Sequence, residues 1–333
     1  MDTLEQRKTV IELYAAGRLP EAYQAASALV AAAPGDLQIL DLLHKIRMEF
    51  NSSKQLEFLT DLSKQVRWIN NSVSQGLVHS ILQDPKFDDP LRLERFGACA
   101  ASQNEEDGML AEIFRRIGTT SRTFFEFGVG NGLQNITLAA LLQGWSGAWI
   151  EINLPKAQFI RERFADAIRA GKLVLGTTAV NAENINQISK ELKVPDEIDL
   201  MSIDIDGNDY HVFKAMDRVR ARVLVMEYNP LYPPPMRVVM AYDRNYAYND
   251  NTYVGASLQS VTELAEAKGY RLVACSISGV NAVFVRSDLA AGKFAEPATP
   301  AHLFHTARFQ LSYSGGFGAG HKSNINKFEE PKW

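Results

Sequence analysis

The sequence has few cysteines, and their scarcity excludes two kinds of architecture. Cys99 and Cys275 are the only two among 333 residues, and they lie far apart. They form neither a metal knuckle nor a redox pair, and two cysteines cannot build a disulfide framework. Such sparing use of cysteine is typical of a reducing compartment, so we expect a cytoplasmic protein.

Long hydrophobic runs are also missing. No apolar stretch approaches the roughly 20 residues that a membrane-spanning helix needs. The first residues, MDTLEQRKTVIEL, carry charges where a secretory signal needs an apolar core. The sequence therefore predicts no membrane span and favours the cytoplasmic location.

The sequence also lacks a strong excess of positive or negative charge. The chain has 35 Lys and Arg against 39 Asp and Glu, which gives a net charge of −4. This balance provides no basic surface for nucleic acid or for an anionic membrane. Because 46% of the residues are hydrophobic, the chain can bury a sizeable core, and a globular protein is expected.

Residues 1–95 have the pattern of a separate helical region. Apolar residues recur at helical spacing, and the stretch GRLPEA interrupts them from Gly17 to Ala22. The segments LYAAGRLPEAY and AAPGD are similar to one tetratricopeptide (TPR) unit, but no convincing second copy follows at a period of about 34 residues. We expect a TPR-like hairpin that docks a protein partner or self-associates, or one that only covers a face of the next domain.

From about residue 120, short apolar runs alternate with amphipathic helical stretches. This alternation predicts a doubly wound, Rossmann-like parallel sheet, buried on both faces, in a domain over residues 96–290. The last two runs, 270–276 and 281–286, are joined by a short turn and predict an antiparallel hairpin. The earlier runs are 123–127, 148–152, 172–175, 198–204 and 223–227, with helices expected near 132–143, 156–170, 183–192, 209–219 and 257–268.

Residues 291–333 lose this alternation and are rich in Gly, Ser and Asn. Such composition predicts a mobile tail or a flap. Its histidines, His302, His305 and His321, do not have the spacing of a metal site, and we expect solvated loop histidines.

The stretch FFEFGVGNGLQNITLAALL places glycines between a predicted strand and a predicted helix, where doubly wound sheets bind nucleotide-like ligands. A dinucleotide fingerprint fails here, because Leu133 stands where a third small residue is needed. Glu126 would repel a pyrophosphate but can pair with an ammonium group. Glu126, Gly128, Gly130 and Asn131 therefore predict a site for a nucleoside that carries an amino acid, namely S-adenosylmethionine.

Two later positions extend this predicted cofactor site. Glu151 ends the second strand, where a carboxylate accepts hydrogen bonds from the ribose hydroxyls. Asn181, after the third strand, is a candidate for the adenine edge. In an alternative interpretation Glu151 is only the N-cap of the helix that begins near Pro155.

Four carboxylates crowd the stretch IDLMSIDIDGNDYH. A calcium-binding EF-hand is excluded, because counting from Asp204 puts the glycine at position four and an alanine at position twelve. The apolar residues instead mark a buried strand whose carboxyl end delivers Asp204 and Asp206 to the cofactor side. Asp209 falls in the first turn of the next helix, where a carboxylate favours the helix dipole.

The chemistry at this strand end has two candidate routes. Asp204 or Asp206 can act as the base that removes the acceptor's proton, and His211 is a further candidate that can equally face away. Alternatively, Asp204 or Asp206, with Glu227 and Asn229 of the stretch MEYNP, provides oxygen ligands for Mg²⁺ or Mn²⁺.

A long aromatic insertion, NPLYPPPMRVVMAYDRNYAYNDNTYVG, follows the fifth strand. Its tyrosines are of a type that packs against sugar rings, so we expect an acceptor-binding role. They are Tyr232, Tyr242, Tyr246, Tyr248 and Tyr253, of which Tyr232 and Tyr253 are the leading candidates. The alternative is a loop that only packs over the sheet edge, although long structured loops are more often functional.

Five segments over about residues 100–290 resemble the FkbM-type branch of class I S-adenosylmethionine-dependent methyltransferases. They are SQNEEDGMLAEIF, FFEFGVGNGLQNITLAALLQGWSGAWIE, IDLMSIDIDGNDYHVF, VLVMEYNPLYPPP and YVGASLQSVTELAEAKGYRLVACSISGVNAVFVR. The resemblance implies an O-methyltransferase that acts on sugars, polyketides or related small molecules, often in the synthesis of surface glycans. It also implies a seven-strand sheet whose last strand is antiparallel.

The sequence thus predicts a cytoplasmic S-adenosylmethionine-dependent O-methyltransferase whose acceptor is a sugar or glycoconjugate hydroxyl, with a divalent metal as an option. The alternatives are a polyketide or peptide acceptor, or a methyltransferase fold that serves only as a binding module.

Overall fold

The computed structural model describes residues 3–32, 36–248, 253–308 and 311. Two compact units divide the chain, Met1–Ile69 and Asn70–Trp333. The sequence predicted a helical region to residue 95, a domain over 96–290 and a tail, and this three-part division stays a prediction.

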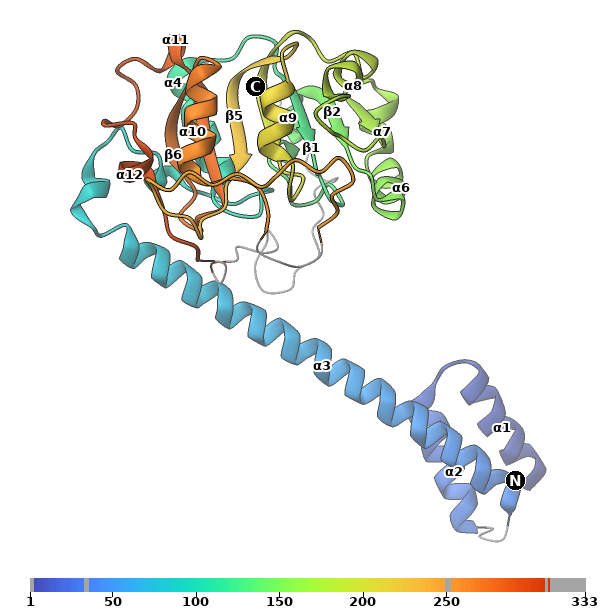
Figure 1. Cartoon of the computed structure of the whole chain (residues 1–333). Helices are drawn as coiled ribbons and strands as arrows, with labels where there is room; N and C mark the ends of the chain where they lie inside the picture. Colours follow the sequence, from blue (N-terminus) through green and yellow to red (C-terminus); the bar gives the residue numbers. More distant parts are fainter. Residues whose placement is uncertain (1–2, 33–35, 249–252, 309–310, 312–333) are drawn as a thin grey trace, which may run out of the picture. The chain divides into compact units, whose positions relative to one another are not determined.

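The first unit is helical, as the sequence predicted, and its described residues form three helices where the sequence suggested a hairpin. They are α1 (Thr3–Ala15), α2 (Leu19–Ala32) and α3 (Leu37–Ile81), the last of which continues beyond the unit (Figure 1). A small core of Val10, Ala22, Ala26 and Ile46 holds them together. Gly17, at a φ of +72°, makes the turn between α1 and α2.

In the second unit, the described residues form one seven-stranded sheet with the order β3-β2-β1-β4-β5-β7-β6. Strands β1 to β5 are parallel, and β7 runs antiparallel to both β5 and β6. The predicted sheet, hairpin and antiparallel last strand are confirmed (Figure 1). The strands are β1 (Thr123–Phe127), β2 (Ser146–Ile150), β3 (Leu173–Gly176), β4 (Glu197–Ile203), β5 (Arg220–Glu227), β6 (Tyr270–Cys275) and β7 (Asn281–Arg286).

Helices cover both faces of this sheet, which explains why its strands are apolar on both sides. One core lies between the sheet and α8 (Ile185–Glu191), α9 (Asp209–Ala215) and α10 (Leu258–Ala267). The opposite core involves α4 (Glu106–Ile117), α5 (Leu138–Leu142), α6 (Leu154–Arg163) and α7 (Ala165–Arg169). Short elements complete the unit: the 3-10 helices η1 (Pro85–Asp88) and η2 (Glu94–Phe96), and the helices α11 (Ser287–Ala290) and α12 (Pro300–Leu303). No helix in the described ranges combines the length and the hydrophobicity that crossing a membrane requires.

The start of the predicted tail packs onto the second unit. Leu303 belongs to the core, and the Tyr228 hydroxyl donates to the His305 carbonyl at 3.0 Å. The expectation of a solvated histidine is wrong for His305, which is 3% exposed and lies 3.4 Å from the buried Glu94 carboxylate. His321 and residues 309–310 and 312–333 lie outside the described residues.

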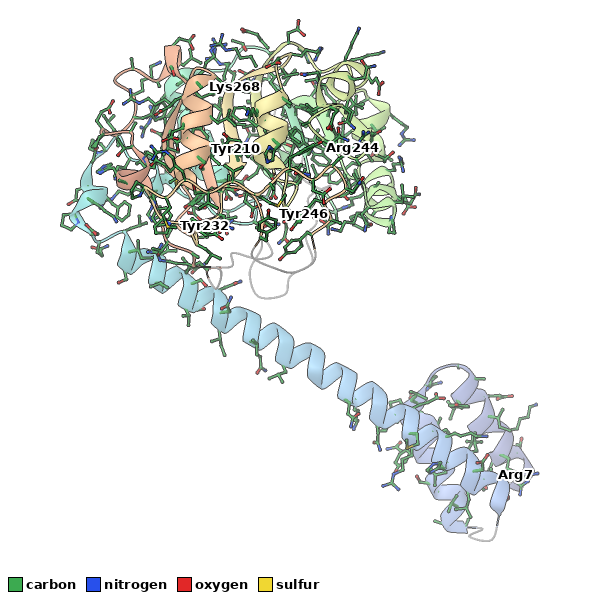
Figure 2. All side chains as sticks on the ribbon, in the orientation of Figure 1. Arg7, Tyr210, Tyr232, Arg244, Tyr246 and Lys268 are labelled. Carbon is green, nitrogen blue, oxygen red and sulfur yellow. The ribbon has the colours of Figure 1, made fainter. Side chains whose placement is uncertain are left out.

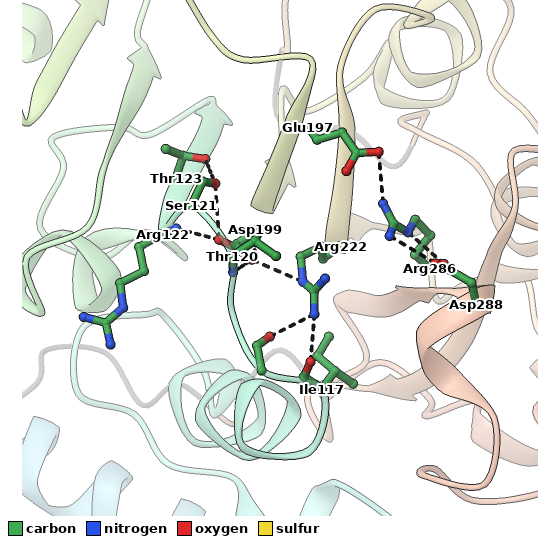
Figure 3. A network of polar contacts seen from close by, with 11 residues as sticks. Ile117, Thr120, Ser121, Arg122, Thr123, Glu197, Asp199, Arg222, Arg286 and Asp288 are labelled. Atoms are coloured by element: carbon green, nitrogen blue, oxygen red, sulfur yellow. Dashed lines mark hydrogen bonds and ion pairs between the residues drawn. The ribbon is translucent and has the colours of Figure 1, made fainter.

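Asp199, the first of the four clustered carboxylates, serves the fold at the amino end of β4. Its oxygens accept hydrogen bonds from the Arg122 amide at 2.6 Å and from the Thr120 amide at 2.9 Å, and they pair with Arg222 at 3.2 Å (Figure 3). The side chain is fully buried.

We expect Asp199→Ala to lower the free energy of unfolding by about 3–5 kcal/mol, because it leaves Arg222 and two amides without their buried partner. Urea denaturation measures this loss. Asp288→Ala, which breaks the exposed pair with Arg286 in the same region, is the matched control and should cost less than about 1 kcal/mol. Equal losses in both variants would contradict the assignment.

Candidate active site

The glycine loop after β1 brings the ends of two strands into contact. Gly128 has a φ of +87°, and a Cβ on it would stand 1.4 Å from the carbonyl oxygen of Asp204. Only glycine permits this approach. The ends of β1 and β4 therefore meet at the carboxyl edge of the sheet.

Glu126 organises the loop rather than facing a ligand freely. Its carboxylate accepts from the Asn135 side chain at 2.6 Å, the Ile136 amide at 2.9 Å and the Thr137 amide at 3.0 Å. Burial raises its pKa, and the hydrogen bonds from Thr137 and Asn135 oppose that rise. These contacts hold 131–137 as a loop, so the helix predicted near 132–143 forms only over Leu138–Leu142.

Glu151 follows β2 and is not the cap of α6. Asn153 is that cap, since its side chain accepts from the Lys156 amide at 3.1 Å. The Oε1 atom of Glu151 accepts from the Asn153 amide at 2.7 Å, while Oε2 has no hydrogen-bond partner among the described residues. The side chain lines a cavity next to the glycine loop.

Two adjacent cavities open at this edge of the sheet. Cavity A, of about 220 Å³, is lined by Gly128, Gly130, Glu151, Ile152, Lys156, Ala179, Val180, Asp204, Asp206, Asn208, Arg244 and Tyr246, among others. Cavity B, of about 240 Å³, is lined by Gln103, Glu126, Gly128, Gly130, Asn131, Gln134, Asn135, Lys156, Asp204 and Asn281, among others. Because Gly128, Gly130, Lys156 and Asp204 line both, one elongated ligand can extend through the two.

Three carboxylates converge beside cavity A. Oxygens of Asp204, Asp206 and Glu227 lie within 4.8 Å of one another. Burial, followed by repulsion from neighbouring carboxylates, raises the pKa of Asp204 and of Glu227 well above their ordinary values, and the two side chains share a hydrogen bond. Asp206 is the exposed member and has a left-handed φ of +56°.

Of the residues predicted for the site, Asn229 and His211 have structural partners instead, and Asp209, for which the sequence indicated a structural role, has structural partners too. Asn229 is buried, accepting from the Leu231 amide at 3.1 Å and donating to the Val254 carbonyl at 3.1 Å, so its side chain is engaged in the loop. The Asp209 carboxylate accepts from the Ile205 and Gly207 amides at 2.7 and 2.9 Å. His211 bonds the Met240 carbonyl at 2.7 Å and lines neither cavity.

The other predicted contacts are partly displaced. Asn181 turns the chain, because its side chain accepts from the Glu183 and Asn184 amides, and its neighbours Ala179 and Val180 line cavity A instead. Asn131 was predicted to contact the cofactor, and it lines cavity B. Its side chain also accepts from the Leu133 amide at 3.0 Å.

Tyr246, rather than Tyr232 or Tyr253, is the tyrosine that lines cavity A. Figure 2 labels Tyr246 and Tyr232 among the side chains. The Tyr246 ring lies on Gly207, where a Cβ would stand 2.5 Å from the ring. Its hydroxyl donates to the carbonyl of Tyr253 at 3.0 Å, while the Tyr253 side chain is 56% exposed.

Sequence reasoning also missed Lys156, Arg244, Gln103 and Asn281 as cavity residues. The segment SQNEEDG carried the signal for Gln103, because a polar run next to a glycine-rich site is a candidate for ligand contact. Lys156 and Arg244 had no local signal, since their place depends on how α6 and the loop after β5 pack.

Several solved structures are similar to part of this chain at low sequence identity. A Staphylococcus aureus protein provisionally assigned as a caffeoyl-CoA O-methyltransferase is 15% identical over 54% of this chain and 82% of its own, with a TM-score of 0.37. The N-terminal domain of EvdMO1 with SAH bound is 16% identical over 54% and 80%, with a TM-score of 0.35. A SAM-dependent methyltransferase from Aquifex aeolicus is 16% identical over 60% and 93%, with a TM-score of 0.33. No family model and no curated protein matches the chain.

Proposed function

We propose that this chain is an S-adenosylmethionine-dependent O-methyltransferase of the FkbM-type branch, with a sugar or glycoconjugate hydroxyl as its acceptor. The observation that carries the proposal is the convergence of the glycine loop, Glu151 and Asp204 on one cavity at the carboxyl edge of the sheet. Doubly wound sheets bind nucleoside ligands at this edge. A cytoplasmic location and a docking role for the N-terminal, TPR-like helices belong to the same proposal.

The cofactor's nucleoside fits cavity A. The Oε2 atom of Glu151 is available to accept from ribose hydroxyls, and Ile152 and Val180 offer apolar side chains for the adenine faces. The glycine loop lets the backbone approach the sulfur end of the cofactor. Tyr246, at the same cavity, is an aromatic surface for the acceptor.

Methyl transfer is an in-line displacement at the sulfonium carbon. The acceptor oxygen forms a bond to the methyl carbon while the carbon–sulfur bond breaks, and the sulfur leaves as a neutral thioether. The acceptor's proton must go to a base, and the raised pKa values of Asp204 and Glu227 make each carboxylate a stronger base than an ordinary one. Holding the acceptor oxygen in line with the methyl carbon and the sulfur contributes further to the rate acceleration.

The carboxylate cluster also fits a hard divalent cation. Asp204, Asp206 and Glu227 supply only oxygen ligands, which Mg²⁺ and Mn²⁺ prefer, and their mutual repulsion favours a cation between them. When bound, the cation would lower the pKa of an acceptor hydroxyl. Asn229 is not included, because its amide is engaged elsewhere.

We expect chelator treatment to abolish methyl transfer and Mg²⁺ or Mn²⁺ to restore it. Independently of activity, either ion should raise the melting temperature of the chelated wild-type protein, because it relieves the repulsion within the cluster. Glu227→Gln should lose this shift. Full activity in excess chelator would eliminate the metal from the proposal.

The reaction itself is tested with S-adenosylmethionine labelled in its methyl group and a panel of sugars, polyketides and peptides. Labelled methyl ethers of a saccharide are the expected product. Transfer only to polyketides or peptides would contradict the saccharide acceptor and assign the enzyme to one of those acceptor classes. Cofactor binding without any methyl transfer would favour a binding module.

A further inference from the structure

Arg244 lines cavity A from the loop after β5 and is labelled in Figure 2. Its side chain is exposed, so it lies at the mouth of the cavity rather than on its floor. Among the described residues, no hydrogen bond or ion pair engages its guanidinium group. Because arginine keeps its charge at any physiological pH, the mouth of cavity A carries a positive charge that is free to bind a ligand.

The backbone around Arg244 is held in place by a β-turn. The Tyr246 amide donates to the Asp243 carbonyl at 3.0 Å, so Arg244 occupies the second position of a four-residue turn. The buried side chain of Asn208 donates to the same carbonyl at 2.7 Å, and the ring of Tyr246 packs on Gly207. The turn that carries Arg244 is therefore fixed to the residues that follow β4.

The other charged groups near this turn have partners of their own. A hydrogen bond from Tyr242 lowers the pKa of Glu183, and the charge of Arg244 lowers it further without forming an ion pair. Burial raises the pKa of Asp206, and the charge of Lys156, on the same cavity, opposes that rise. Lys156 thus acts on the carboxylate cluster, whereas Arg244 acts on no carboxylate of that cluster.

The position of Arg244 favours a contact with the acceptor rather than with the methyl donor. Arg244 is two residues from Tyr246, the aromatic surface proposed for the acceptor, whereas the donor's ribose is assigned to Glu151 and its sulfur end to the glycine loop. A guanidinium group forms two parallel, charge-assisted hydrogen bonds with a carboxylate or a phosphate. A sugar whose CH face packs on Tyr246 can present such an anion to Arg244.

We propose that the acceptor is an acidic saccharide and that Arg244 determines this specificity by pairing with a carboxylate or phosphate of the methylated sugar. The inference rests on the proposed function and deepens it by naming the class of acceptor. A neutral sugar leaves the guanidinium group without this pair, so it should be a poorer substrate.

Labelled methyl transfer to matched pairs of acceptors tests this specificity. One kind of pair is a hexuronic acid glycoside and its neutral uronamide, and the other is a hexose 6-phosphate and its parent hexose, each in the gluco, galacto and manno configurations. For at least one pair, we expect a kcat/KM about tenfold or more higher for the acidic member, the size of a charge-assisted hydrogen bond. Comparing the two kinds of pair shows whether the enzyme prefers the carboxylate or the phosphate.

Three variants assign the preference to Arg244. Arg244→Gln should raise KM for the acidic acceptor about tenfold and remove the preference, whereas Arg244→Lys should keep part of it, because it retains the charge without the planar fork. Arg161→Gln, in an exposed arginine of α6 that lines neither cavity, is the matched control and should keep the full preference.

Equal kcat/KM values within every pair, or an undiminished preference in Arg244→Gln, would overturn the inference and leave the proposed function standing. Weaker binding of S-adenosylhomocysteine but not of 5′-methylthioadenosine, which lacks the amino-acid end, would assign Arg244 to the donor's carboxylate and would also overturn it. If S-adenosylhomocysteine bound but no saccharide accepted the label, the saccharide acceptor of the proposed function would fail together with the inference.

Discussion

Glu227→Gln will abolish methyl transfer and at the same time stabilise the protein. Burial raises the pKa of the Glu227 and Asp204 carboxyls, and without a cation the repulsion between them raises it further. A neutral amide in place of Glu227 removes the repulsion and can donate to Asp204. Replacing a buried charge in this way stabilises proteins by about 1–3 kcal/mol.

The sign of the pH dependence follows from the raised pKa values. In the unfolded chain Glu227 has its ordinary pKa near 4.5, and in the folded protein this pKa is raised, so the folded form binds the proton more tightly. The stability that this proton provides is fully present below the unfolded pKa and is lost as the pH rises through the folded pKa. As the pH rises from the unfolded pKa through the folded pKa of Glu227, the free energy of unfolding of the chelated wild-type protein should therefore fall. Over the same pH range the Glu227→Gln variant should lose less of its free energy of unfolding.

Thermal denaturation of chelated samples measures this effect. A gain of 1–3 kcal/mol corresponds to a rise in melting temperature of roughly 2–4 °C per kcal/mol for a domain of this size. Glu263→Gln, which removes a carboxylate from an exposed pair with Arg237, is the matched control and should change little. A lower melting temperature in Glu227→Gln, or retained methyl transfer, would contradict the assignment of this cluster.

Glu151→Ala will weaken S-adenosylhomocysteine binding by roughly 100-fold. Two ribose hydroxyls that donate to a carboxylate provide two charge-assisted hydrogen bonds, each worth about 1.5–3 kcal/mol, and part of that gain offsets desolvation of the ligand. The loss should appear equally with 5′-methylthioadenosine, which keeps the ribose.

The control for this prediction is Glu162→Gln, an exposed carboxylate of α6 that contacts Gln158. It should bind S-adenosylhomocysteine like the wild type. A Glu151→Ala variant with wild-type affinity would mean that the ribose lies elsewhere, even if the glycine loop binds the cofactor.

Much of the fold was predictable because each strand is a short apolar run and each helix is amphipathic. β1 and β7 have the predicted limits, and the antiparallel hairpin follows from one short turn. The helix expected from residue 132 is shorter because Glu126, nine residues before Asn135, takes the donors of the loop. Such a contact between distant positions has no periodic signal in the sequence.

The site was predictable where it depends on strand ends. Asp204 and Glu227 lie together because β4 and β5 are parallel neighbours, and this follows from the order of the runs. The roles expected for Asn229 and His211 depended instead on side-chain direction, and both side chains bond to the loop after β5. Asn281 was missed because its place beside the glycine loop depends on the sheet order.

The most direct test of the account is calorimetric titration of the wild-type protein with S-adenosylhomocysteine. We expect one site per chain, competition by S-adenosylmethionine and weaker binding of 5′-methylthioadenosine. If the folded protein took up no S-adenosylhomocysteine at millimolar concentration, the methyltransferase proposal would be contradicted.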